Sequence, residues 1–216
     1  MSESSVHQFE KKNRVARQSL TAAIVITLIK VVAAYVSGSL GVLSEVFNSG
    51  IDIFVAIVTI ISVRYSSKPP DKDHNYGHEK IESFSALFQV FILFITSAYI
   101  IYEAIQRLFI RPEVELNISI WIILALIVSM VIDYFRAKAL REVAKETNSR
   151  ALEADALHFS VDILSSSIVI IGLILTYLGV SKIADTIAAL AVTVIILKLG
   201  FDLARKSFDS LMDRVP

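Results

Sequence analysis

The sequence contains no cysteine, which excludes disulfide bridges and thiolate metal sites, so any metal must be held by nitrogen and oxygen. Charged residues are also scarce, at 19% of the 216 residues against about 25% in an ordinary soluble domain. The 21 lysines and arginines are balanced by 21 aspartates and glutamates, which leaves no excess of positive charge for nucleic acid. These absences argue against a disulfide-rich secreted protein, a nucleic-acid-binding protein and most soluble enzymes.

Apolar residues, in contrast, are abundant and gathered in long runs. Hydrophobic residues make up 55% of the chain, and residues 83–102, 116–132 and 163–181 carry no charge. A helix needs roughly 17–25 apolar residues to cross a bilayer. Together with the shorter apolar segments, these runs predict an all-α membrane protein whose spans are 14–37, 41–66, 79–109, 116–140, 150–178 and 182–206.

The orientation of these six helices follows from the distribution of lysine and arginine. Sixteen of the 21 fall on one side of the predicted membrane, three (Arg107, Arg111 and Lys182) on the other, and two within spans. Lysine and arginine accumulate in cytoplasmic loops. We therefore expect both termini in the cytoplasm, with residues 1–13 as an N-terminal tail, and a multi-pass protein of the cell (inner) membrane. The tail lacks an apolar core and does not resemble a cleaved signal peptide.

Two predicted spans carry matching polar clusters. Glu45, Asn48 and Asp52 in the second span align with Asp155, His158 and Asp162 in the fifth, at an offset of 110 residues. Ionisable residues within membrane helices are costly and usually functional. The two clusters therefore form an internal repeat that marks a candidate site.

The spacing within each cluster suits a metal site. Residues four apart share a helix face, so Asn48 and Asp52 can point together, as can His158 and Asp162. Four nitrogen and oxygen ligands from two facing helices suit a tetrahedral divalent metal such as zinc. Small residues nearby, among them Gly50 and Ala154, would let the helices approach closely. The alternative is that these polar groups only bond the helices together.

A second candidate cluster lies in the predicted cytoplasmic loop between the second and third spans. Asp71, His74 and His78 fall within eight residues, and the two histidines are four residues apart. These residue types can hold a peripheral metal ion. The alternative is an ordinary solvated turn.

These features together carry a resemblance to a known family. Six spans, the stretch HNYGHEKIES at 74–83 and the stretch NSRALEADALHFSVD at 148–162 resemble the cation diffusion facilitator family over about residues 14–214. Members export divalent metals, often zinc, in exchange for protons, as homodimers. The resemblance implies a transport site at Asn48, Asp52, His158 and Asp162, and a weaker loop site at Asp71, His74 and His78.

Two departures from the family accompany the resemblance. The family commonly has aspartate or histidine where this chain has Asn48, a weak neutral ligand, which leaves iron, cobalt, nickel, cadmium and manganese open beside zinc. Members usually also carry a cytoplasmic metal-binding domain after the sixth span. We expect residues 211–216 to begin the linker to such a domain, which this chain does not include.

The sequence thus predicts a proton-coupled exporter of a divalent transition metal, with the metal as substrate and no cofactor. Metal ligands must be deprotonated, so protons compete with the ion, and His158 is the natural proton carrier because imidazole titrates near neutral pH. The rival interpretation is a membrane-embedded metal-dependent enzyme that activates a water molecule.

Overall fold

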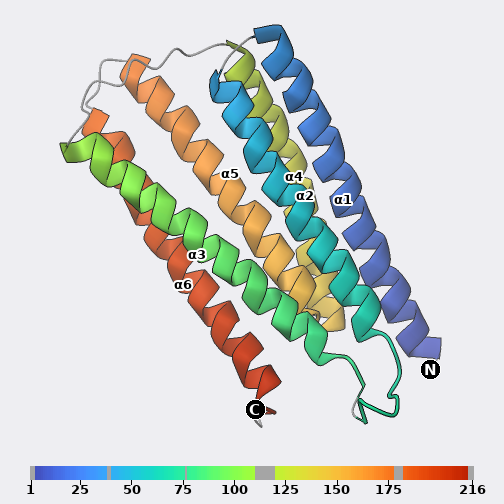
Figure 1. Ribbon diagram of the computed structural model, residues 1–216. Helices are drawn as coiled ribbons and strands as arrows, with labels where there is room; N and C mark the ends of the chain where they lie inside the picture. Colours follow the sequence, from blue (N-terminus) through green and yellow to red (C-terminus); the bar gives the residue numbers. More distant parts are fainter. Residues whose placement is uncertain (1–2, 38–39, 76, 110–119, 178–181, 214–216) are drawn as a thin grey trace.

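The computed structural model describes residues 3–37, 40–75, 77–109, 120–177 and 182–213, and this part of the chain is helical with no β-strand (Figure 1). The all-α prediction is therefore confirmed. The helices are α1 (Glu3–Ser37), α2 (Leu40–Ser66), α3 (Lys80–Phe109), α4 (Ile120–Thr147), α5 (Arg150–Tyr177) and α6 (Lys182–Leu211).

Three helices extend further than the apolar runs that predicted them. Helix α1 begins at Glu3 instead of residue 14, α4 continues to Thr147 beyond residue 140, and α6 continues to Leu211 beyond residue 206. Apolar runs mark only the membrane part of a helix, and polar turns continue beyond it where they find partners. Lys11 of α1, for example, forms an ion pair with Glu146 of α4. Residues 3–13, expected as an N-terminal tail, therefore form the first turns of α1.

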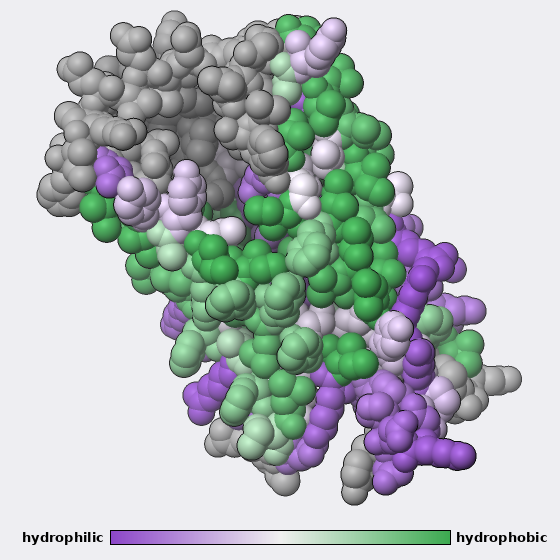
Figure 2. Space-filling model, viewed as in Figure 1, coloured by the Kyte–Doolittle hydropathy of each residue, from purple (hydrophilic) through white to green (hydrophobic). Residues whose placement is uncertain are grey.

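Helix α1 begins, and α6 ends, at the same end of the bundle, which we call the terminal end (Figure 1). Figure 2 shows hydrophobic surface over the middle of the bundle and hydrophilic residues gathered at the terminal end. Three described segments are long and apolar enough to cross a membrane, namely Val6–Val36, Asn48–Ser66 and Lys80–Gln106. The chain is accordingly a membrane protein.

Helix α5 is the central helix of the bundle, and it lies between the α3/α6 pair and the helices α1, α2 and α4 (Figure 1). It contributes to each of the three buried apolar clusters: Phe159 packs with α1, α2 and α4, Ala154 with α3 and α6, and Val161 also with α3 and α6. The face of α5 that is turned towards α2 is therefore enclosed. The polar residues that α5 contributes to the internal repeat lie on this face.

A two-residue turn sets the position of α5. Asn148 adopts a positive φ of 50°, and the Ser149 amide donates to the carbonyl of Ala144, which closes α4 with a Schellman motif. The Ser149 hydroxyl then accepts a hydrogen bond from the Leu152 amide at 3.4 Å and caps the N-terminus of α5. One helix cap directly follows the other, so the register of α5, and with it the direction of His158, is fixed from this turn.

A buried carboxylate joins four helices at the terminal end. Glu82 of α3 accepts hydrogen bonds from Lys12 of α1 at 2.9 Å, from Ser66 of α2 at 2.8 Å, and from Ser149 at the start of α5. Lys80 of α3 also pairs with Asp213, just beyond α6, at 2.7 Å. Charged groups therefore hold the helices together where the bundle meets water.

Among the described glycines, Gly200 is the one with neighbouring side chains in tight contact, and the sequence did not single it out. A Cβ at Gly200 of α6 would lie 3.0 Å from the Phe94 ring and 3.2 Å from a Leu93 methyl, both on α3. Gly50, which was expected to allow close packing beside the site, has no atom within 4 Å of such a Cβ. The glycine that allows tight packing thus lies between α3 and α6.

We expect Gly200→Leu to lower the melting temperature of the purified protein, because the α3–α6 contact has no room for a larger side chain. Overpacking of this kind costs about 1–3 kcal/mol. Gly50→Leu is the matched control, since its new side chain would enter open space. Equal melting temperatures for the two variants would contradict the packing described.

Candidate metal centre

Three side chains of the internal repeat meet between α2 and α5. Nε2 of His158 lies 3.1 Å from Oδ1 of Asp52 and 3.7 Å from Oδ2 of Asp162. Ligand atoms of these three residues all lie within 4.8 Å of one another. Two carboxylates and one imidazole therefore converge on one point inside the bundle, although Asp52 and His158 are 106 residues apart in sequence.

The separations suit a small divalent cation. A tetrahedral ion with ligands at about 2.0–2.2 Å has neighbouring ligand atoms about 3.4 Å apart, and the two observed distances fall on either side of this value. In the described part of the chain, Oδ2 of Asp162 is buried and accepts no hydrogen bond. A buried acceptor without a partner is costly, and a cation at this point would satisfy it.

Asn48 lies one turn before Asp52 on α2, but its environment differs. Its side chain is exposed, whereas Asp52 and His158 are buried. The buried cluster in the structure thus consists of three of the four residues expected from the sequence. Asp155, which aligns with Glu45 in the repeat, belongs to a different network.

That network lies one turn away on α5 and centres on Arg136 of α4. The Arg136 guanidinium pairs with Asp133 at 2.8 Å, donates to the Ser19 hydroxyl at 3.2 Å and stacks at 3.5 Å on the Phe159 ring. Ser19 of α1 in turn donates to Oδ2 of Asp155 at 3.3 Å. The buried guanidinium thereby links α1, α4 and α5 beside the cluster of Asp52, His158 and Asp162.

Sequence reasoning missed the role of Arg136. The charge count placed it among the cytoplasmic cations, but its side chain is only 5% exposed. One signal was present: Asp133 and Arg136 are three residues apart and share a helix face, next to an apolar run. A pair of opposite charges at this spacing can enter the bundle together, where a single arginine would not.

The loop cluster also forms in the structure. Oδ1 of Asp71 accepts from the His74 amide at 2.8 Å and lies 3.1 Å from Nδ1 of the same residue, while Oδ2 lies 3.5 Å from Nε2 of His78. The two imidazole rings are 4.4 Å apart. Gly77, at φ 79°, makes the turn that returns His78 to Asp71.

The loop carboxylate is held in its charged form. Partial desolvation raises the pKa of Asp71, but hydrogen bonds from the His74 side chain and from the backbone amides of His74 and Asp73 outweigh it, so the pKa lies below its usual value. Asp71 therefore remains negative at neutral pH and offers a charged oxygen beside the two imidazoles.

A bundle of apolar helices that encloses a pair of carboxylates and an imidazole is a membrane protein with ionisable groups gathered between its helices. Residues 17–212 match the family model described as the cation efflux transmembrane domain. This match covers most of the chain, which therefore belongs to the cation diffusion facilitator family of cation efflux proteins.

Individual relatives agree with this assignment. An "uncharacterized transporter" of Methanocaldococcus jannaschii is 35% identical over 198 residues, which are 92% of this chain and 69% of the relative. The proteins named cation-efflux pump FieF of Serratia proteamaculans and Cronobacter sakazakii are 31% and 32% identical, over 96% and 93% of this chain and 68% and 67% of their own lengths. The chain is thus similar to proteins that are named as transporters and cation-efflux pumps.

Proposed function

We propose that this chain exports a divalent transition metal, zinc in the first place, from the cytoplasm in exchange for protons. The observation that carries the proposal is the meeting of Asp52, His158 and Asp162 between α2 and α5, at distances that suit a tetrahedral ion. Membership of a cation efflux family supports the transport of cations. The identity of the metal, the coupling to protons and the direction of transport are parts of this proposal.

Proton exchange follows from the chemistry of the His158–Asp52 contact. At 3.1 Å the two atoms are within hydrogen-bonding distance, and such a bond needs a proton between nitrogen and oxygen. A metal ion requires both groups without that proton. An imidazolium at His158 therefore releases one proton when the ion binds, and a proton that arrives from the other side of the membrane restores the imidazolium and displaces the ion.

Transport also requires that the site opens to each side in turn. The ligands come from two helices, one carboxylate from α2 and the other two groups from α5. A small movement of α2 against α5 would separate them and weaken binding. Alternating access by rocking of one helix group against another uses such a movement.

The test is proton flux in liposomes that contain the purified protein and a pH-sensitive dye. An outward zinc gradient should drive protons in the opposite direction, and a panel of zinc, cobalt, iron(II), manganese, cadmium and nickel should rank the substrates. Calcium and magnesium, which prefer oxygen ligands alone, should drive little flux because one ligand here is an imidazole. Absence of flux with every ion would overturn the proposal.

The same assay separates transport from the rival enzyme function. A membrane-embedded metal-dependent enzyme would bind zinc at the same three residues but would move neither zinc nor protons across the liposome membrane. Zinc binding without flux would therefore favour the enzyme.

We also propose that both termini lie in the cytoplasm and that all six helices span the membrane. The charge asymmetry supports this, as does the gathering of hydrophilic residues at the terminal end (Figure 2). The chain has no cysteine, so single cysteines at Glu3 and at Met212 can be labelled selectively. Both should react with a membrane-impermeant reagent only after the membrane is opened. Labelling of either position from the outside of intact cells would contradict this topology.

The loop cluster would then face the cytoplasm and bind a second metal ion. We expect the His74→Ala/His78→Ala double variant to contain one bound zinc fewer per chain and to keep substantial transport, since the loop lies outside the membrane core. Lys72→Ala, in the same loop, is the control. Metal content after dialysis, measured by mass spectrometry, tests this. Unchanged zinc in the double variant would favour the solvated turn.

We also propose that the protein acts as a homodimer, as the resemblance to its family implies. Light scattering of the purified protein, corrected for bound detergent, should give twice the chain mass of 23.9 kDa. A mass of one chain at all concentrations would exclude the dimer for this length of chain.

A further inference from the structure

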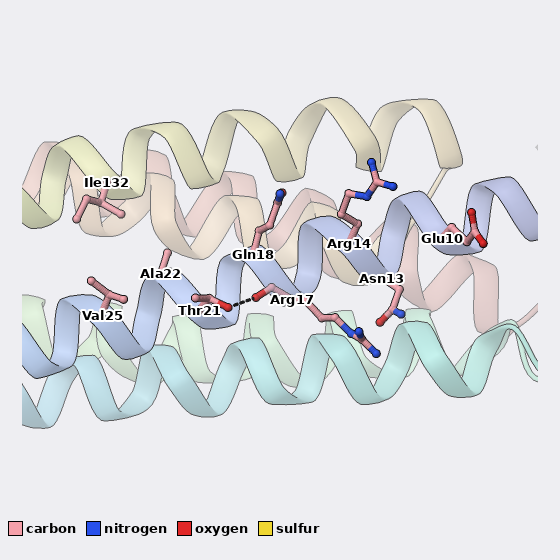
Figure 3. Close-up of a pocket in the computed structure, with 9 residues that line it drawn as sticks. All are labelled: Glu10, Asn13, Arg14, Arg17, Gln18, Thr21, Ala22, Val25 and Ile132. Atoms are coloured by element: carbon pink, nitrogen blue, oxygen red, sulfur yellow. Dashed lines mark hydrogen bonds between the residues drawn. The ribbon is translucent and has the colours of Figure 1, made fainter.

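A shallow groove of about 750 Å³ follows the outer side of α1 (Figure 3). Figure 3 shows its lining residues in order along the helix, with Glu10 at one end, Val25 at the other, and Ile132 of α4 beside Ala22 and Val25. The groove thus changes character along its length. The half nearer the terminal end is charged and the other half is apolar.

The charged half contains two arginines without an acidic partner. Neither Arg14 nor Arg17 forms an ion pair with a carboxylate in the described part of the chain, and both side chains are exposed. Lys11 and Lys12 on the same helix are paired with Glu146 and Glu82. Two guanidinium groups one turn apart at the border of an apolar helix are therefore available to an anion.

A polar acceptor lies beside them. Oδ1 of Asn13 is buried and has no hydrogen-bond partner in the described part of the chain. Thr21, by contrast, donates its hydroxyl proton to the carbonyl of Arg17 (Figure 3). The groove therefore offers two charged donors and one unsatisfied acceptor, with Arg17 and Asn13 on one side of α1 and Arg14 on the other (Figure 3).

The apolar half lies at the correct depth for an acyl chain. Eleven residues separate Arg14 from Val25, which is about 16 Å along the helix axis. This distance carries the groove from the headgroup layer, a few ångströms thick, well into the hydrocarbon. A second, smaller groove of about 300 Å³ shares Gln18, Ala22 and Ile132 and continues between α1 and α4.

We propose that this groove binds one anionic phospholipid, phosphatidylglycerol, whose phosphate is held by Arg17, while Arg14 on the other side of α1 adds to the positive charge that attracts it. A glycerol headgroup also supplies the hydroxyl donors that Oδ1 of Asn13 lacks, and an acyl chain lies along Ala22, Val25 and Ile132. Basic pockets on the cytoplasmic side of membrane helices bind anionic headgroups in this manner. The bound lipid covers the outer surface of α1 beside α4.

Another basic cleft is a poorer candidate. It lies between α4, α5 and α6 and has a volume of about 660 Å³. Most of its cations are already engaged: Arg141 donates to Ser160, and Arg150 and Lys206 both pair with Glu153, which leaves Lys145 as a single cation. The groove on α1 is therefore the better match for an anionic headgroup.

The test counts the lipids that remain on the purified chain. The protein is stripped in detergent and titrated separately with phosphatidylglycerol, phosphatidylethanolamine and phosphatidylcholine, and native mass spectrometry measures retention. We expect one phosphatidylglycerol per chain, retained at least about tenfold more tightly than the other two lipids. Equal retention of phosphatidylethanolamine would mean a zwitterionic occupant and would overturn the proposal.

Variants assign the binding to the groove. Arg14→Gln/Arg17→Gln should abolish the preference, while Lys138→Gln/Arg205→Gln, which removes the same charge from exposed positions on α4 and α6, should keep it. Equal loss in both pairs would reduce the effect to general surface charge. A change in oligomeric mass without a change in retained lipid would assign the groove to a second copy of the chain.

Two further variants keep the proposal testable if the Arg14→Gln/Arg17→Gln variant does not fold. Arg14→Lys/Arg17→Lys keeps the charge but loses the bidentate geometry, so it should weaken phosphatidylglycerol retention only in part. Ala22→Phe leaves both arginines in place and fills the apolar half, so it should also reduce retention. Unchanged retention in Ala22→Phe would overturn the placement of the acyl chain.

Discussion

Replacement of Asp162 by alanine is expected to abolish metal-driven proton flux in liposomes while the protein still folds. Asp162 is one of the three expected ligands in the cluster, and its Oδ2 has no other partner in the described part of the chain. Loss of residues that merely support metal ligands costs about 10–100-fold, so loss of a ligand should exceed 100-fold. Asp52→Ala should have the same effect.

Asp52→Asn separates charge from shape in this experiment. The variant keeps the size of the side chain and an oxygen ligand, but the cluster with a neutral imidazole changes from a net charge of −2 to −1. Zinc affinity should therefore fall strongly even though the hydrogen bond to His158 can persist. Asp202→Ala, at an exposed position on α6, is the control and should transport normally. Normal flux in Asp162→Ala would show that the site lies elsewhere.

The second large effect is expected on stability. Arg136→Met should lower the free energy of unfolding by about 3–5 kcal/mol, the usual result when one partner of a buried ion pair is removed. The substitution leaves Asp133 without its cation and Ser19 without its donor, and it removes the stacking on Phe159. Unfolding in mixed micelles, followed by circular dichroism, gives the measurement.

Two variants make the Arg136 prediction specific. Arg141→Met removes an exposed arginine from the same helix, where it donates one hydrogen bond to Ser160, and should cost about 1 kcal/mol. Asp133→Leu combined with Arg136→Met should recover part of the loss, because the unpaired carboxylate is then absent as well. A cost for Arg136→Met no greater than that of Arg141→Met would contradict the buried network.

The sequence alone was sufficient to predict the helices and most of the residues in the buried cluster. Uncharged runs identify membrane helices because the hydrocarbon tolerates few alternatives. The four-residue spacing of His158 and Asp162, repeated at Asn48 and Asp52, identifies the faces that must meet. These are local properties, and a single sequence displays them. The assignment of metal to this cluster stays a prediction.

Features that depend on helix packing could not be obtained in this way. Gly200 is one of seven glycines, and only the position of Phe94 on another helix makes its missing side chain important. Asn48 lies in register with Asp52, yet the rotation of α2 in the bundle leaves it exposed. Arg136 resembles any other cation at the edge of an apolar run until α1 and α5 supply Ser19 and Phe159.

The contact between Asp52 and His158 has a consequence for how the chain is made. The two residues are 106 positions apart, and at about 5–20 residues per second the ribosome needs roughly 5 to 20 s to progress from one to the other. During this interval α2 has been synthesised but its carboxylate lacks the imidazole that later accompanies it. An aspartate at the centre of a membrane helix costs about 3 kcal/mol to insert. We therefore expect α2 to be held less firmly in the bilayer until α5 has emerged and its imidazole can accompany the carboxylate.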